Sequence, residues 1–387
     1  DLHSDAGQVA AVRWLSYSVI VAGALQVAML LPSLRAVGFR FHPSFHFWTP
    51  QVRRMVTLTI PVALSAAVLQ ISVLMDKGFA FLLSQGPGRS VFHLFGHTLT
   101  YPMAEGATQR LNWAQFMYQF PLGVFAIALA TAIFPKLSAD AQDTEDSIAP
   151  EQSNSHLRKP YTTSPRVPDG FKTILRHGVE ASLFIGLPAS VGMIVVCHPA
   201  VALLFQHGNF TAEDTKLVAL STAIYSAAIW AFSLQQILNR AYYALHDTTT
   251  PLIWGIVNLT INTIIEIPLL WTGLHEAGMA VGTLVSFAIQ AIVMLWMLDR
   301  RCGGLHLRQS AAPILKMLIA STLMFLACMS IQYLPHYPSG SHKLTWAIQL
   351  FVLMAVGGLV YFGACAVMGM NVMEHFPRRR KSKASLK

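Results

Sequence analysis

Three polar residues spaced four apart, Asn258, Asn262 and Glu266, lie within one apolar stretch of the sequence. In an α-helix this spacing places the three side chains on one face. Asp76 lies in another apolar stretch, and Thr283 lies at the start of a third. Amide, carboxylate and hydroxyl oxygens suit a hard monovalent cation or a proton relay better than a soft metal. The spacing therefore predicts either a polar stripe that bonds neighbouring helices or a cation site completed by Asp76 and Thr283.

The packing interpretation of this stripe is favoured over the cation site. Hydrogen bonds between helices in a membrane are common and contribute about 0.6 kcal/mol each, and Lys77 is positioned in the sequence to neutralise Asp76. The cation site stays open because an ionisable group inside a membrane span costs about 2.5 to 3.5 kcal/mol. Such a group needs a partner or a hydrated cavity.

A second signature is QFMYQFPLGVF, residues 115–125, which opens a long apolar run. Gln115 and Gln119 are four apart and share one helix face. Pro121 removes a backbone donor, and Gly123 lowers the stability of the helix. We predict a bendable start to a cavity-lining helix, with the glutamines on its polar face.

The sequence predicts neither an enzyme nor a metal or cofactor site. It contains no HExxH motif, no paired carboxylates and no nucleophile with a nearby base. The four cysteines are scattered without CxxC spacing, which gives neither a disulfide framework nor a zinc site.

The elements that position these residues are apolar helices. The chain has 387 residues, 54% of them apolar and 12% charged, whereas soluble domains carry about 25% charged residues. A membrane-spanning helix needs about 20 mostly apolar residues. Nine such runs occur, at residues 14–34, 55–83, 112–134, 175–197, 217–244, 251–271, 277–298, 312–334 and 344–369. We predict an all-α fold, a polytopic membrane helical bundle of about nine transmembrane helices.

Positive charge alternates along the chain. Most of the 27 Lys and Arg residues lie in alternate connections and in the tail from 378 to 387. Connections rich in Lys and Arg stay on the cytoplasmic side, so the pattern predicts an outside N-terminus and a cytoplasmic C-terminus. The net charge of +9 is then a topology signal. The segment RRRKSK is interpreted as an anchor near anionic lipid and not as a nucleic-acid site.

The connections carry further signals. Residues 137–172 are rich in Ser, Thr, Pro and Asp and predict a flexible cytoplasmic loop, whereas no element is predicted between residues 84 and 110. Thr211 and Asp214 fit a capping box at a helix start. Thr250 before Pro251 is interpreted as an N-cap followed by Pro in the first helical turn.

Four longer motifs occur in order along the chain. They are NWAQFMYQFPLGVFAIALATAIFPKLS (112–138), GLPASVGMIVV (186–196), PAVALLFQHGNFTAEDT (199–215) and RAYYALHDTTTP (240–251). In these motifs the chain resembles the MurJ/MviN lipid II flippases of the MOP exporter superfamily. The resemblance implies structural roles for five residues of the last motif, namely Arg240, Tyr243, Asp247, Thr250 and Pro251.

The family has fourteen spans, in two six-helix lobes and a final pair. The resemblance therefore implies that the nine runs are spans 6–14 and that the chain is a fragment lacking about the first five helices. Residues 1–54 would be the last helix of the first lobe and a cytoplasmic linker, and residues 55–300 the six-helix second lobe. Residues 301–387 would be a C-terminal pair that forms a lipid groove, followed by a basic cytoplasmic tail.

The function that the resemblance implies is transport without bond formation. A flippase of this family moves the undecaprenyl-linked peptidoglycan precursor, lipid II, across the bacterial cytoplasmic (inner) membrane by alternating access, for cell-wall synthesis. The implied partners are the polyprenyl-linked glycan lipid, membrane lipids, and a monovalent cation or proton. No cofactor and no nucleic acid are expected.

One residue departs from the family pattern. The family usually carries a cavity-facing arginine where this chain has Phe116, and a phenyl ring cannot pair with a diphosphate. Arg110, six residues earlier and about 9 Å along a helix, compensates only if the start of the span shifts. The candidate cavity residues are Arg110, Gln115, Phe116, Gln119, Pro121 and Gly123. The departure leaves two alternatives open, a related MOP exporter of drugs or of another polyprenyl-linked glycan, and a non-transporting membrane scaffold.

Overall fold

The computed structural model of the chain describes residues 5–36, 38, 48–86, 90–94, 97–148, 168–335, 337–338, 340 and 342–370. The chain divides into two compact units, Asp1–Leu58 and Thr59–Lys387. The first unit contains α1 (Asp5–Ala36) and the first turns of α2 (Pro50–Leu82). The part of α1 from Val12 to Ala36 is long and apolar enough to cross a membrane.

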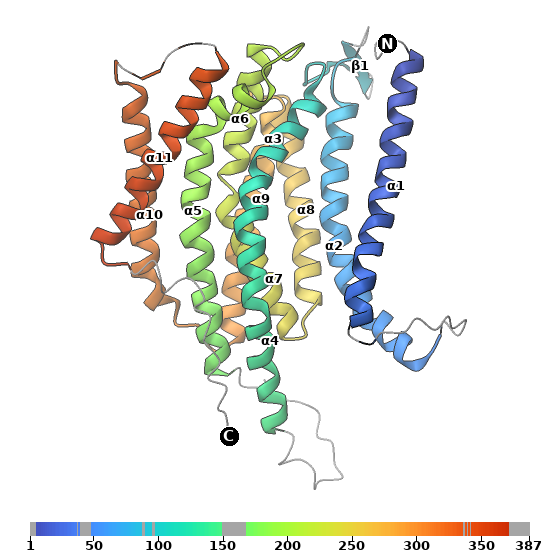
Figure 1. Cartoon of the computed structure of the whole chain (residues 1–387), viewed down its shortest axis with the longest axis vertical. Helices are drawn as coiled ribbons and strands as arrows, with labels where there is room; N and C mark the ends of the chain where they lie inside the picture. Colours follow the sequence, from blue (N-terminus) through green and yellow to red (C-terminus); the bar gives the residue numbers. More distant parts are fainter. Residues whose placement is uncertain are drawn as a thin grey trace. The chain divides into compact units, whose positions relative to one another are not determined.

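The second unit is a bundle of helices (Figure 1). Besides the rest of α2, it contains α3 (Ala107–Pro121), α4 (Ala128–Ile148), α5 (Asp169–Phe205), α6 (Ala212–Ser226), α7 (Ile229–Ala244), α8 (Thr249–Leu270), α9 (Ala277–Arg301), α10 (Leu307–Gln332) and α11 (Lys343–Val367). A π-helical segment, η1 (Leu122–Ile127), joins α3 to α4. It follows Pro121, whose missing N–H interrupts the α-helical bonding pattern.

The expected membrane helices are present. Among the described residues, seven helices are long and apolar enough to cross a membrane, or up to eight if α6 and α7 form one span bent by 42°. Seven of the nine expected runs fall on one helix each, including the run 55–83 on α2. The run 112–134 covers α3, η1 and the start of α4, and the run 217–244 covers α6 and α7. The prediction of an all-α bundle with helices of membrane-spanning length is confirmed.

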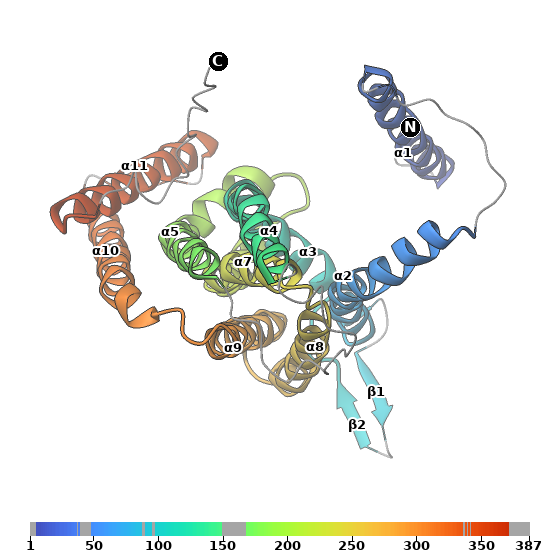
Figure 2. The ribbon, with the colours of Figure 1, turned by 90° about the horizontal axis from the view of Figure 1, so that it is seen from below.

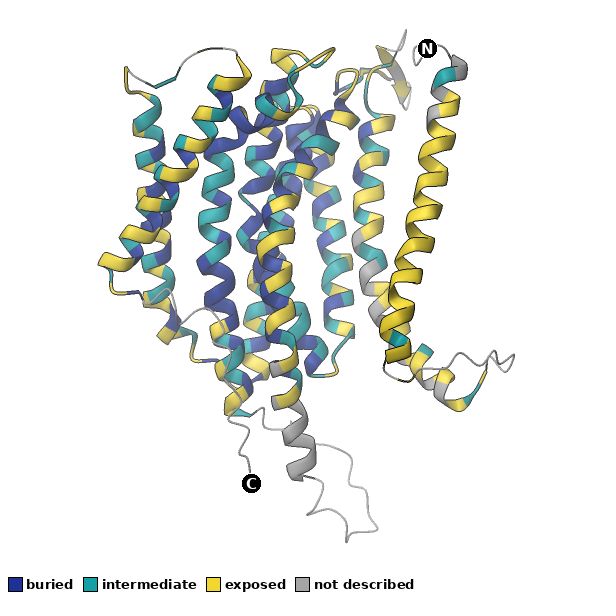
Figure 3. Ribbon diagram, viewed as in Figure 1, coloured by how far each residue is buried: buried dark blue, intermediate teal, exposed yellow. Residues whose placement is uncertain are grey.

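The core of the second unit is built around α5, which packs against α6, α7, α10 and α11. Figure 3 shows that buried residues concentrate on the inner helices of this unit. Gly186 of α5 lies so close to α7 that a Cβ atom there would be 2.9 Å from the Cα atom of Trp230. At the break before α7, the Trp230 backbone N–H donates to the Ser190 hydroxyl at 3.1 Å. This contact satisfies a donor that the first turn of a helix leaves free.

The C-terminal pair α10 and α11 packs on α5, as seen along the helices in Figure 2. Polar contacts anchor both helices. The Tyr361 hydroxyl donates to the Phe184 carbonyl oxygen at 2.8 Å, and the Ser310 hydroxyl donates to Glu180 at 2.6 Å. Because these groups are buried, the bonds fix how the pair sits on the bundle.

Two connections differ from the expectations. Between residues 84 and 110, where no element was predicted, strands β1 (Val91–Leu94) and β2 (His97–Thr100) form an antiparallel hairpin with Val91 opposite Thr100. The expected loop 137–172 is helical at both ends, since α4 continues to Ile148 and α5 begins at Asp169. Residues 137–148 contain neither Gly nor Pro, so nothing in them ends the helix. The middle of that loop, residues 149–167, and the tail beyond 370 lie outside the described residues.

Of the two predicted helix starts, one is confirmed and the other is wrong. The capping box of α6 is confirmed, because the Asp214 N–H donates to the Thr211 hydroxyl at 3.1 Å and the Thr211 N–H donates to the Asp214 carboxylate at 3.0 Å. The N-cap role assigned to Thr250 is wrong. Asp247 accepts from the backbone N–H groups of Thr249 (3.1 Å) and Thr250 (2.9 Å) instead. The Asp247 carboxylate accepts both of these bonds, and it also accepts a hydrogen bond from the Thr250 hydroxyl at 2.7 Å.

Candidate functional site

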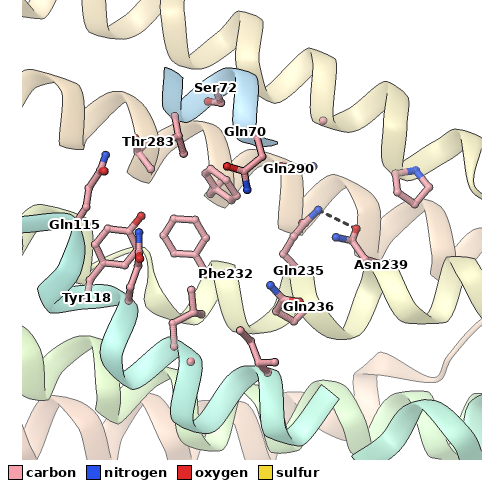
Figure 4. Close-up of a pocket in the computed structure, with 18 of the residues that line it drawn as sticks. Gln70, Ser72, Gln115, Tyr118, Phe232, Gln235, Gln236, Asn239, Thr283 and Gln290 are labelled. Carbon is pink, nitrogen blue, oxygen red and sulfur yellow. Dashed lines mark hydrogen bonds between the residues drawn. The ribbon is translucent and has the colours of Figure 1, made fainter. Parts of the chain in front are cut away.

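The second unit contains a partly open cavity of about 820 Å³, lined by residues of α2, α3, η1, α4, α6, α7, α8 and α9 (Figure 4). Side-chain amides dominate its polar lining, which comprises Gln70, Gln115, Gln119, Gln235, Gln236, Asn239 and Gln290, together with Ser72, Asp76, Tyr118, Tyr225, Arg240, Tyr243 and Thr283. Neutral amides both donate and accept hydrogen bonds. The cavity can therefore hold a polar ligand between helices of otherwise apolar sequence.

Three of the predicted cavity residues line this space. Gln115 and Gln119 come from the last turns of α3, and Gly123 comes from η1. Gln115 is buried. The spacing of four places the two glutamines on one face, as the helical period requires.

Phe116 and Pro121 are not among the lining residues. Phe116 is 55% exposed, and Phe120 on the following turn is also exposed. Pro121 is buried in the helix packing. The assignment of Phe116 and Pro121 to this cavity is therefore corrected: consecutive helical residues point about 100° apart, which turns Phe116 away from the face of Gln115.

Arg110 does not line the cavity either, which corrects its assignment as a compensating cavity arginine. Its guanidinium makes two bonds to the Glu276 carboxylate, 2.5 Å from Nε and 3.1 Å from Nη2. It also contacts Asp214 at 3.3 Å and the Glu105 carbonyl oxygen at 3.0 Å. Arg110 and Glu276 are both buried, so the guanidinium is held by this ion pair between α3 and the start of α9.

The polar stripe of α8 lies against α2. The Asn262 Nδ2 atom donates to Asp76 Oδ1 at 3.2 Å and to Glu266 Oε2 at 3.0 Å. All three side chains are buried, as is Asn258 on the turn before. The helix α9 approaches them closely, because a Cβ atom at Gly282 would lie only 3.0 Å from Asn262 Oδ1.

Several polar atoms of this stripe have no hydrogen-bond partner among the described residues. They are Asn258 Nδ2, Asn262 Oδ1 and Glu266 Oε1. Asp76 belongs both to the stripe and to the cavity wall, whereas Thr283 lines the cavity without a bond to the stripe. The stripe thus gathers two carboxylates and unpaired amide atoms next to the cavity.

The motif RAYYALHDTTTP contributes more to the cavity than its structural assignment predicts. Arg240, Tyr243 and Pro251 all line it. The Arg240 Nη2 atom donates to the Thr131 hydroxyl at 3.0 Å, and its guanidinium lies 5.9 Å from the centre of the Phe134 ring. Among the described residues that line this cavity, Arg240 is the only arginine.

Asp247 lies outside the cavity, in the connection between α7 and α8. It pairs with Arg301 at the end of α9. Burial favours the neutral acid, but the bonds from Thr250 and Arg301 outweigh burial and lower the pKa of Asp247. The ionised carboxylate therefore ties the start of α8 to the end of α9, which is a structural role.

Sequence reasoning missed the amides of α7 and α9. Gln235 and Asn239 are four apart, as are Gln236 and Arg240, so helical spacing was available as a signal. On α9, Ser286 and Thr283 stand four and seven residues before Gln290, so the same spacing was available there.

The chain is similar to known lipid II flippases. A family model described as lipid II flippase MurJ matches residues 3–356. The probable lipid II flippase MurJ of Rhizobium tropici is 27% identical over 379 residues, which cover 96% of this chain and 63% of that protein. The protein of the same name from Vibrio cholerae is 28% identical over 294 residues, covering 76% of this chain and 46% of that protein.

A solved structure shares the fold. A lipid II flippase MurJ in an inward closed conformation matches with a TM-score of 0.58 and 19% identity, over 86% of this chain and 57% of that chain. At this identity the likeness concerns the fold alone, and it agrees with the expected helical bundle.

The matches cover this chain and its relatives to different extents. The family model matches almost the whole chain, residues 3–356. The chain spans 63% and 46% of the length of the two relatives. The match to the family model covers far more than half of the residues, and on this evidence the chain belongs to the lipid II flippase MurJ family.

Proposed function

We propose that this chain takes part in moving lipid II, an undecaprenyl-linked peptidoglycan precursor, across the bacterial cytoplasmic membrane. Membership of the family supports the proposal. The structural observation that carries it is the cavity of about 820 Å³, lined by amides and one arginine and built from apolar helices. Transport of this kind makes and breaks no bond of the lipid, in keeping with the absence of catalytic motifs in the sequence.

Arg240 is the residue that we assign to the lipid diphosphate. A guanidinium forms paired hydrogen bonds with phosphate oxygens. In this structure the Arg240 side chain is held by Thr131, and Gln236 and Asn239 line the cavity beside it. This assignment replaces the family arginine at the position of Phe116, whose exposed ring does not line the cavity.

The stripe beside the cavity is the proposed coupling site. Asp76, Asn262 and Glu266 form one hydrogen-bonded group, with Thr283 close by on the cavity wall. Two carboxylates that share one amide are relieved of mutual repulsion by a proton or a monovalent cation. We propose that binding of such an ion at this stripe is linked to the conformational cycle of transport.

The orientation proposed for the chain follows the positive-inside pattern. In Figure 1 the connections α7–α8 and α9–α10 lie at the same end of the second unit as the end of α4 and the start of α5. Basic residues of the expected cytoplasmic segments belong to the helix ends found there, among them Arg176 near the start of α5 and Arg301 at the end of α9. The pattern supports a cytoplasmic position for this end and for the C-terminal tail.

The proposal is tested in cells whose own copy of this gene is depleted. Lipid II is expected to accumulate in the inner leaflet, where an externally added lipid II-cleaving enzyme cannot reach it. The wild-type protein restores cleavage, Arg240→Gln reduces it, and Arg240→Lys restores part of it because a single ammonium lacks the planar fork of arginine. Arg308→Gln, an exposed arginine outside the cavity, serves as the matched control.

Other outcomes distinguish the alternatives. An unchanged leaflet distribution after depletion would end the flippase proposal, and loss of drug efflux without a cell-wall defect would favour the related exporter. Phe116→Arg is expected to leave lipid II binding unchanged, because Phe116 does not line the cavity. Tighter binding in that variant would return the headgroup contact to position 116.

A further inference from the structure

Two buried glutamines on different helices of the cavity wall have unpaired carbonyl oxygens. Gln235 of α7 is 6% exposed and Gln290 of α9 is 3% exposed. Both side chains line the cavity (Figure 4). The Oε1 atom of each has no hydrogen-bond partner among the described residues. Both oxygens are covered by neighbouring protein atoms, and a buried amide oxygen without a partner is unfavourable. A small turn of each side chain towards the cavity would let a ligand donor satisfy it.

The orientation of both amides is set by one methionine. The Gln235 Nε2 atom donates to Met294 Sδ at 3.3 Å and to Asn239 Oδ1 at 3.2 Å. The Gln290 Nε2 atom donates to the same sulfur at 3.8 Å. A thioether sulfur accepts hydrogen bonds and donates none. The two NH₂ groups therefore face Met294, and the two carbonyl oxygens are left for other partners.

Met294 is itself fixed in the core. It is fully buried, and the Tyr242 hydroxyl of α7 donates to its carbonyl oxygen at 3.0 Å. The sulfur that orients the glutamines thus belongs to a rigid contact between α7 and α9. A binding group is most selective when neighbouring contacts hold it in place before the ligand arrives.

The chemistry of the pair selects a class of ligand. Carbonyl oxygens accept hydrogen bonds, and they repel the oxygens of a phosphate. Phe232, which also lines the cavity, packs against Phe287 with ring centres 4.2 Å apart and adds an apolar wall. Hydroxyl and amide N–H groups are the donors that suit such a surface.

We propose that Gln235 and Gln290 form a subsite that accepts hydrogen bonds from the sugar hydroxyl and amide N–H groups of the transported headgroup. This inference rests on the proposed function, because it assumes that the cavity receives the headgroup. It assigns recognition of the hydroxyl and amide N–H groups of the glycopeptide to α7 and α9 and leaves the diphosphate to Arg240.

The test compares two lipids on the purified full chain in detergent. Lipid II carries the glycopeptide, whereas undecaprenyl diphosphate carries the same tail and diphosphate without it. The wild type is expected to bind lipid II more tightly. Gln235→Leu and Gln290→Leu should each weaken lipid II binding about fivefold and leave the affinity for undecaprenyl diphosphate unchanged. Gln109→Leu, on an exposed residue of α3 outside the cavity, should change neither affinity.

A second pair of variants guards against misfolding. Gln235→Asn and Gln290→Asn keep a buried amide but withdraw its oxygen by one methylene, and the same selective loss is expected from them. Equal weakening of both lipids, or no weakening of lipid II in any glutamine variant, would overturn the subsite while leaving the proposed function intact. A wild-type chain that binds neither lipid would overturn both.

Discussion

Asn262 on α8 donates a hydrogen bond to Asp76 on α2, with 3.2 Å between Nδ2 and Oδ1, across 186 positions of sequence. The same amide group also donates to Glu266 at 3.0 Å. One amide therefore lies between two buried carboxylates from two helices. Since two nearby carboxylates resist simultaneous ionisation, the packing of α2 on α8 depends on what neutralises this group.

Asn262→Leu removes the shared donor and leaves both carboxylates without it. We expect the sodium or pH dependence of transport to change and the free energy of unfolding to fall by about 1 to 3 kcal/mol. Transport across a series of sodium concentrations and pH values measures the first effect, and thermal unfolding measures the second. Thr260→Val is the control, because Thr260 is exposed on the same helix. An ion dependence identical to wild type would leave the stripe a packing role alone.

The buried ion pair of Arg110 and Glu276 predicts a non-additive result. Glu276→Leu leaves the guanidinium without its main partner and should destabilise the fold by about 3 to 5 kcal/mol. Adding Arg110→Met should recover most of this loss, because two apolar residues pack without a charge. The control Glu213→Gln breaks an exposed pair with Lys216 and should change stability by no more than about 1 kcal/mol. Additive losses in a double-mutant cycle would contradict the coupling.

Asp247 predicts a pH effect whose sign follows from its lowered pKa. The ionised carboxylate holds Thr250 and Arg301 in the folded state, so its stabilisation is present above the ordinary pKa of aspartate. That stabilisation is lost as the pH falls through the lowered folded pKa. Unfolding measured between about pH 6 and pH 2 should show wild type losing its advantage over Asp247→Asn towards acid. A constant difference over that range would show that the charge of Asp247 is not involved.

Gly186 predicts a penalty for a single added methyl group. A Cβ atom there would lie 2.9 Å from the Trp230 Cα atom and 3.3 Å from the Ser233 side chain. Since backbone cannot yield as a flexible side chain does, Gly186→Ala should cost about 1 to 3 kcal/mol of stability. Gly363 on α11 has open space at the same position, so Gly363→Ala should be neutral or stabilising through its helix propensity. Equal melting temperatures for the two variants would refute the close contact between α5 and α7.

The sequence predicts the helices well because an apolar run of membrane-spanning length has few alternatives. The four-residue spacing of Asn258, Asn262 and Glu266 likewise predicts one shared face, and the structure places their helix against Asp76. The partner of Arg110 was not predictable in this way. Glu276 lies 166 positions away, and no local period connects the two residues.

The cavity was predicted only along α3, where the polar residues follow a helical period. The same spacing occurs on α7, at Gln235 and Asn239, and on α9, at Ser286 and Gln290, but the packing of several helices decides that these faces meet the cavity. The hairpin at 91–100 was missed for another reason, since its two short strands lie in a stretch that carries no membrane-helix signal. The spacing of residues in the sequence predicts which side chains share a helix face, whereas the tertiary packing decides which helix faces contact one another.

The π-helical segment η1 acts as a one-residue insertion that the span absorbs without a loop. Continuing the α-helical period from Gln119 would bring Ala126 and Ile133 to the cavity, yet these two are buried in the packing instead. Ile127 and Phe134, one position later, line the cavity. Deleting a single residue within η1 would therefore turn the part of the span that follows it by about 100°. The face now buried in the packing would then line the cavity, while the length of the span hardly changed.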